Sequence, residues 1–158
     1  MIHHLSMSAQ DPYHVACVVA ELLNGACVPF PPSEGGYLAY APDGHGTGVE
    51  VLQAGMVMQP DGPTGARYDR LPPTPSFSPT HFALSVSCTP ERVMEIARRE
   101  NWECHVCSRG NDFDVIELWI ENRFLVEVLP PSFAARYLAF TAAFAAAPHS
   151  LASHVARS

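Results

Sequence analysis

Two acidic residues interrupt otherwise apolar stretches of this sequence. The letters VEVL occur at Val49–Leu52 and again at Val126–Leu129, and each copy holds one glutamate, Glu50 or Glu127, between two valines. In a β-strand each glutamate would face away from its valines. A carboxylate in apolar surroundings needs a shifted pKa, a cation or a metal. The sequence contains no lysine, and Arg123 is the nearest arginine along the chain, so a metal ion is the leading counter-ion.

Two histidines have a matching position in the sequence. His4 begins the alternating run HLSMS, His81 begins HFALSVS, and 46 positions separate each histidine from its glutamate. Two imidazoles and two carboxylates can converge on one divalent cation and leave positions open for water or substrate. This donor set suits nickel, cobalt, manganese, iron or zinc without selecting among them. The alternative is that each residue is merely a solvated strand residue.

The elements that must position these residues also occur twice. Asp11-Pro12 and Thr89-Pro90 each predict the start of a helix, with a capping side chain followed by proline. A strand-like run precedes each helix and three follow it, in the first half ACVPF, YLAYAP and GVEVLQ, in the second ECHVCS, FDVIELWI and RFLVEVL. The order β-α-β-β-β used twice predicts an α+β fold.

This repeat sets the expected domain boundaries. We place the first module at residues 1–53 and the second at 80–130, joined by a proline-rich linker at 54–79. Its prolines and glycines argue against a helix or a central strand, and a connection of this length is expected to cover a site. Residues 131–158 are expected to form an alanine-rich helix and a tail. The aromatic residues of that helix would pack on its own module or form a dimer contact.

Composition narrows the function further. The net charge of −7 argues against a phosphate-gripping nucleic-acid binder, and the absence of lysine excludes Schiff-base chemistry. No stretch is long and apolar enough to span a membrane, and no signal peptide is visible. The five cysteines are odd in number and irregularly spaced, which favours reduced thiols and a cytoplasmic location. A small-molecule substrate is the expected partner. The use of arginine without any lysine is typical of a GC-rich bacterial genome.

Residues 1–130 resemble the vicinal oxygen chelate superfamily, which includes glyoxalase I, fosfomycin resistance proteins, extradiol dioxygenases and bleomycin resistance proteins. The resemblance rests on the paired modules and on the histidine and glutamate of each, in HHLSM, GVEVL, THFAL and LVEVL. It implies a cupped eight-stranded mixed sheet, a homodimer, and a glyoxalase-I-like metal site made by His4, Glu50, His81 and Glu127.

The resemblance also implies a reaction. A metal-dependent lyase or isomerase would chelate adjacent substrate oxygens, with a carboxylate as general base. Analogy favours Glu127 as the base, and the internal symmetry leaves Glu50 open. The first half supplies few cations for a glutathione carboxylate. A non-haem iron dioxygenase and a metal-free drug-binding protein are the alternatives.

Other polar residues are expected to have structural roles. Cys104 and Cys107 have zinc-knuckle spacing, but positions three apart in a strand face opposite sides. His3 should face away from His4, and His45 lies in a glycine-rich turn. Arg109 falls near a predicted hairpin, where polar residues are expected in any case.

Overall fold

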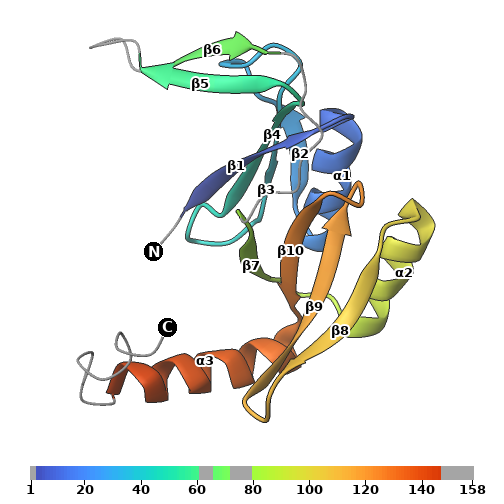
Figure 1. Cartoon of the computed structure of the whole chain (residues 1–158), viewed down its shortest axis with the longest axis vertical. Coiled ribbons are helices and arrows are strands. Elements are labelled where there is room, and N and C mark those ends of the chain that lie inside the picture. The colour runs from blue at the N-terminus through green and yellow to red at the C-terminus, as the bar shows by residue number, and fades with distance from the viewer. Residues whose placement is uncertain (1–2, 61–65, 72–79, 147–158) are drawn as a thin grey trace, which may run out of the picture.

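The two modules predicted from the repeat are present, each as a four-stranded sheet with one helix (Figure 1). The computed structural model describes residues 3–60, 66–71 and 80–146. In the first module the strand order is β1-β4-β3-β2, and in the second it is β7-β10-β9-β8. Within the chain the eight strands therefore form two separate sheets.

Each module contains one helix and four strands. The first module comprises β1 (His4–Ala9), α1 (Pro12–Leu22), β2 (Ala26–Pro29), β3 (Tyr37–Tyr40) and β4 (Gly48–Gln53). The second comprises β7 (Phe82–Ser85), α2 (Pro90–Glu100), β8 (Cys104–Arg109), β9 (Phe113–Ile120) and β10 (Phe124–Leu129). In both modules the first strand pairs in parallel with the fourth, and the remaining pairs are antiparallel.

Local chemistry sets the ends of the first helix. The Asp11 side chain accepts a hydrogen bond from the His14 backbone N–H at 3.0 Å, and Pro12 begins α1 without losing a needed donor. The helix ends before Asn24, whose φ of 51° is left-handed. Gly25 follows because a Cβ atom there would lie 1.8 Å from the Tyr40 carbonyl oxygen. The predicted stop at Gly25 thus combines a left-handed asparagine with a close backbone approach.

Two further elements lie outside the modules. Part of the predicted linker forms an antiparallel hairpin of β5 (Met56–Pro60) and β6 (Ala66–Arg70), which is a two-stranded sheet of its own. Proline excluded a central strand but not this peripheral pair. The predicted C-terminal helix is α3 (Pro131–Ala146), which packs on β9 and β10. Figure 1 shows the hairpin and α3 at opposite ends of the molecule.

A single hydrophobic core joins the two modules. It contains buried residues from both first strands, both helices and both fourth strands. The first helix is apolar on nearly all sides, with seven of its 11 residues buried, whereas α2 buries only Val93, Ile96 and Ala97. A helix that is apolar all round needs cover on more than one side. The second module provides part of that cover for α1.

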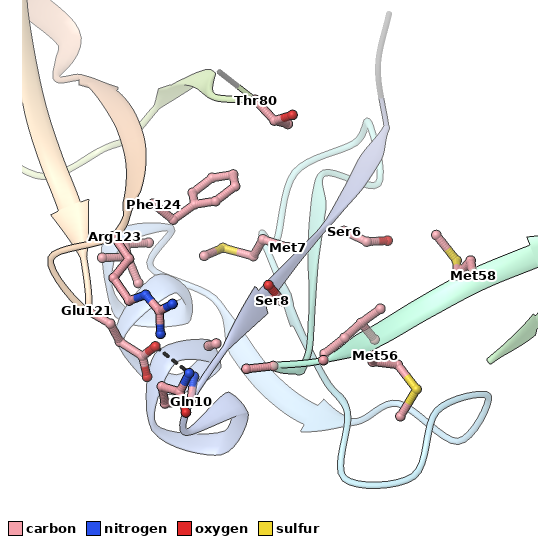
Figure 2. A pocket seen from close by; sticks show the side chains of 15 residues that line it. Ser6, Met7, Ser8, Gln10, Met56, Met58, Thr80, Glu121, Arg123 and Phe124 are labelled. Atoms are coloured by element: carbon pink, nitrogen blue, oxygen red, sulfur yellow. Dashed lines mark hydrogen bonds between the residues drawn. The ribbon is translucent and has the colours of Figure 1, made fainter. Parts of the chain in front are cut away.

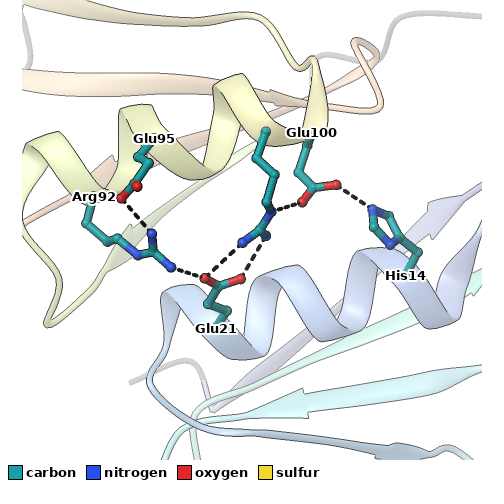
Figure 3. Close-up of polar contacts among 6 residues, drawn as sticks. His14, Glu21, Arg92, Glu95 and Glu100 are labelled. Atoms are coloured by element: carbon teal, nitrogen blue, oxygen red, sulfur yellow. Dashed lines mark hydrogen bonds and ion pairs between the residues drawn. The ribbon is translucent and has the colours of Figure 1, made fainter.

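Ion pairs between α1 and α2 fix how the modules meet (Figure 3). Glu21 of α1 accepts from Arg92 at 2.5 Å and from Arg99 at 2.8 Å, both on α2. At the other end His14 lies 2.6 Å from Glu100, whose second oxygen accepts from Arg99 at 2.5 Å. These ion pairs between the helices add to the shared hydrophobic core that joins the two modules.

Turn residues of the second module also contact the first. Glu121, in the β9–β10 turn, accepts hydrogen bonds from the backbone N–H groups of Gln10 and Asp11 at 2.7 and 2.9 Å. These donors lie at the N-terminus of α1, where a negative charge is favourable. Asn122, the next turn residue, binds the backbone of Glu103 and Asn101. The turn is therefore held on both sides.

These ion pairs predict that the protein loses stability in acid. Hydrogen bonding from Arg99 lowers the pKa of Glu21. Burial raises the pKa of Glu100, but hydrogen bonds from Arg99 and His14 outweigh it and the pKa is lowered overall. A carboxylate with a depressed folded-state pKa stabilises the protein above its unfolded pKa, here ordinarily 4.5, and loses that contribution as the pH falls through the folded value.

We expect the free energy of unfolding, measured by urea denaturation, to fall as the pH drops below about 4.5. Glu21→Gln should reduce stability at neutral pH and make its pH dependence shallower. Glu34→Gln, at an exposed glutamate far from this contact, is the matched control. Equal pH profiles for Glu21→Gln and wild type would contradict the assignment.

Candidate metal centre

The first module positions its histidine and glutamate side by side. His4 and Ser6 alternate along β1, and Ser6 lies opposite Glu50 on β4. The Ser6 hydroxyl donates to Glu50 Oε2 at 2.5 Å, while His4 Nε2 lies 3.6 Å from Oε1. The Glu50 side chain is 13% exposed and that of His4 is 62% exposed. This carboxylate is therefore mostly shielded, with an imidazole at its open side.

The second module repeats this register. Glu127 on β10 lies opposite Ala83 on β7, two positions beyond His81, just as Glu50 lies opposite the residue two positions beyond His4. His81 directly precedes β7 and is exposed. The equal spacing of the sequence thus corresponds to an equal placement on the two sheets, with each glutamate turned away from the valine face that packs in the core.

The counter-ion of Glu127 differs from the expectation. Arg109 Nη2 donates to Glu127 Oε1 at 2.5 Å and to Glu117 Oε1 at 2.7 Å. Arg123, nearest along the chain, forms no ion pair within the described residues. The expectation from the sequence named Arg123 as the nearest arginine, but Arg109 contacts Glu127 because its side chain reaches from the edge strand β8 across β9 to β10.

Of the four predicted ligands, His4 and Glu50 are the two that the structure shows in contact. Within residues 3–60, 66–71 and 80–146, no group of three or more His, Cys, Asp or Glu side chains is placed to hold one metal ion. The donors nevertheless suit a divalent ion, since His4 and Glu50 bring a nitrogen and an oxygen within 3.6 Å of each other. Within its described residues, the single chain does not bring a third candidate ligand to this pair.

A cavity of about 370 Å³ lies between the modules, along β1 (Figure 2). Ser6, which binds Glu50, lines it together with Met56 and Met58 of the β5–β6 hairpin. From the second module Arg123 and Phe124 line the opposite wall. The cavity is thus bounded by hydroxyl and methionine side chains on one side and by Arg123 and Phe124 on the other.

The hairpin also carries a tyrosine close to this half-site. Tyr68 on β6 packs edge-on against Phe30, with ring centroids 6.4 Å apart. Burial and then the negative charge of Glu50 raise the pKa of Tyr68. The segment that was expected to cover a site therefore carries Tyr68, whose pKa is raised in part by the charge of Glu50.

The remaining candidates have structural surroundings. Cys104 faces the core and lies 3.4 Å from the Met94 sulfur, whereas Cys107 lies on the open face near Glu117, so the two thiols are on opposite sides as predicted. The His3 ring contacts the His45 backbone carbonyl. In α3, Tyr137 and Phe140 pack on Phe113 of the same module, which confirms the first of the two expected roles of the helix.

Comparison with known proteins identifies the fold. No family model matches the sequence, and no curated protein matches it. Among solved structures, the genomically encoded fosfomycin resistance protein FosX of Listeria monocytogenes, complexed with Mn(II) and sulfate, has a TM-score of 0.56 and 10% identity, covering 89% of this chain and 96% of that one.

Two further solved structures are similar to this chain. The fosfomycin resistance protein FosX of Mesorhizobium loti has a TM-score of 0.53 and 10% identity over 87% of this chain and 96% of that one. A possible glyoxalase from Bacillus cereus has a TM-score of 0.48 and 13% identity, with 81% and 96% covered. The chain therefore has the α+β fold of the vicinal oxygen chelate superfamily, as the resemblance implied. Within the described residues, no helix is long and apolar enough to cross a membrane.

Two residues of the site were missed in the sequence, although a signal existed. Glu117 is a third acid within an apolar run, FDVIELWI, and antiparallel pairing with β10 places it opposite Glu127. Arg109 lies four positions after His105 on β8, so the two side chains point to the same, open face of the sheet. Only the hairpin register shows that these side chains meet.

The placement of Tyr68 gives a direct test of the first half-site. Glu50→Gln removes the negative charge that contributes to the raised pKa, so the pKa of Tyr68 should fall while staying above 10.0 because burial remains. Spectrophotometric titration, with Tyr68→Phe to assign the signal, measures this. Glu34→Gln should leave the titration unchanged. A Tyr68 pKa insensitive to Glu50→Gln would place the hairpin away from the half-site.

Proposed function

We propose that this protein is a glyoxalase-like, metal-dependent lyase or isomerase acting on a small molecule with vicinal oxygens. The observation that carries the proposal is the equal placement of Glu50 and Glu127 relative to His4 and His81 on two matching sheets. The Mn(II) in the FosX structure shows that this fold holds a divalent ion in that protein. Our assignment of metal binding and of the reaction to this chain is the proposal.

The two half-sites have to meet for one ion to contact all four ligands. Within the described residues, β1 and β7 pair on one side only, so each module has a free sheet edge. Within one chain, Arg92 and Arg99 of α2 contact Glu21 of α1. Pairing between two copies keeps those contacts. We therefore propose a homodimer in which the first module of one copy completes the site of the second module of its partner.

The chain's own residues would divide the chemistry as follows. His4, Glu50, His81 and Glu127 would bind the ion, which when bound supplies Lewis-acid polarisation of adjacent substrate oxygens. One glutamate would also take a proton from the substrate carbon, and analogy favours Glu127 over Glu50. Met56, Met58 and Phe124 contribute apolar side chains to the lining of the cavity.

Metal binding is tested by thermal unfolding of the metal-free protein with nickel, cobalt, manganese, iron(II) or zinc added. An ion that binds only the native state at 100 times its Kd adds about 2.7 kcal/mol. At about 2–4 °C per kcal/mol this corresponds to a Tm rise of roughly 5–11 °C. His4→Ala and Glu127→Gln should abolish most of the rise.

His105→Ala changes an exposed histidine that is not a predicted ligand and should keep the Tm rise. A Tm that none of these ions raises would contradict the metal site and favour a metal-free binding protein. Oxygen-dependent turnover with iron would favour the dioxygenase class.

Proton transfer separates the two glutamates. With excess metal present, Glu127→Gln should abolish solvent exchange of an acidic proton in 2-hydroxycarbonyl compounds, whereas Glu50→Gln should be partly rescued, because only the base must accept the proton. NMR in deuterated water follows the exchange, using a compound that exchanges with the wild type. Equal wild-type exchange in both variants would remove both glutamates from the chemistry.

A further inference from the structure

Two carboxylates lie next to each other on the open face of the second module. Glu117 on β9 is directly opposite Glu127 on β10. Their side chains are only 22% and 16% exposed. Like charges directly across neighbouring strands repel, and shielding from water strengthens that repulsion. The pair therefore requires a cation between its oxygens.

Arg109 provides that cation. One nitrogen, Nη2, contacts Oε1 of both glutamates, at 2.7 Å from Glu117 and 2.5 Å from Glu127. A guanidinium group keeps its charge at every physiological pH. Arg109 thus partly neutralises the negative charge of the Glu117–Glu127 pair.

Among the described residues, the surroundings of Glu50 in the first module differ from those of Glu127. The residue opposite Glu50 on the neighbouring strand is Leu38, where the second module has Glu117. Glu50 is contacted by the hydroxyl of Ser6 and the imidazole of His4, neither of which carries a fixed charge. The positive charge on the open face is thus specific to the second half-site, although the repeat makes the glutamates equivalent.

We propose that Arg109 is a resident cation that a divalent metal must displace from Glu127, so that Arg109 weakens metal binding. This rests on the metal site proposed above. When a metal displaces Arg109 from Glu127, the guanidinium group would keep its ion pair with Glu117. The half-site then holds a cation in both states, the arginine before metal binding and the metal afterwards.

Isothermal titration of the metal-free full chain with Mn²⁺ tests the proposal. Arg109→Gln removes the competing charge, and Mn²⁺ should bind at least about tenfold more tightly than to wild type. Arg136→Gln is the matched control, because Arg136 pairs with Asp114 of the same module at 2.7 Å but does not contact Glu127. Its Mn²⁺ affinity should stay at the wild-type value.

A second variant tests the same proposal in the opposite direction. Glu117→Gln leaves Arg109 with Glu127 as its only partner in the pair, so displacement becomes harder. Mn²⁺ should bind roughly twofold to fivefold more weakly, the size of one partly exposed ion pair. Circular dichroism establishes that each variant is folded, and Glu117→Gln keeps the proposal testable if Arg109→Gln does not fold.

The outcomes separate this proposal from the proposed function. If wild type binds Mn²⁺ and Arg109→Gln binds it equally or more weakly, the displacement proposal is overturned and Arg109 orients Glu127 instead, while the metal site stands. If only Arg109→Gln binds, the proposal is supported and the wild-type metal function is contradicted. If neither binds, both fail.

Discussion

The contact between α1 and α2 determines where a functional site can form in this chain. Glu21 accepts from two arginines of α2, and the apolar surface of α1 is covered by the second module as well as by its own sheet. Both helices therefore lie at the junction, and within the described residues of one chain the candidate ligands do not gather into a group of three or more. Within the described residues of one chain the proposed four-ligand site is thus incomplete, and this is why the proposed function involves a second copy.

The two half-sites are equivalent in backbone and different in charge. The register of each first strand against each fourth strand is the same. Glu50 has neutral or titratable neighbours, whereas Glu127 shares Arg109 with Glu117. A repeated module has therefore kept the positions of its acids while the side chains around them diverged. That difference makes it reasonable to assign different tasks to the two glutamates.

Much of the fold could be predicted from the sequence because its signals are local. Asp11 and Thr89 cap helices, and the VEVL copies mark two buried strands, all of which depend on near neighbours in the chain. The β5–β6 hairpin was missed because proline excludes a central strand but allows a peripheral one. Arg109 was missed as a partner of Glu127 because 18 positions separate them, and only the pairing of three strands brings them together.

Complementation between two inactive variants tests the central claim most directly. One chain carries His4→Ala and Glu50→Gln, and the other carries His81→Ala and Glu127→Gln. If sites form between copies, refolding the two together restores up to about a quarter of the wild-type metal sites, because half of the dimers are mixed and each has one intact site. Metal bound after dialysis, measured by elemental analysis, is the readout. Recovery near that fraction from two chains that bind no metal alone is the predicted result. No recovery, when mixed dimers are shown to form, would contradict a site shared between copies.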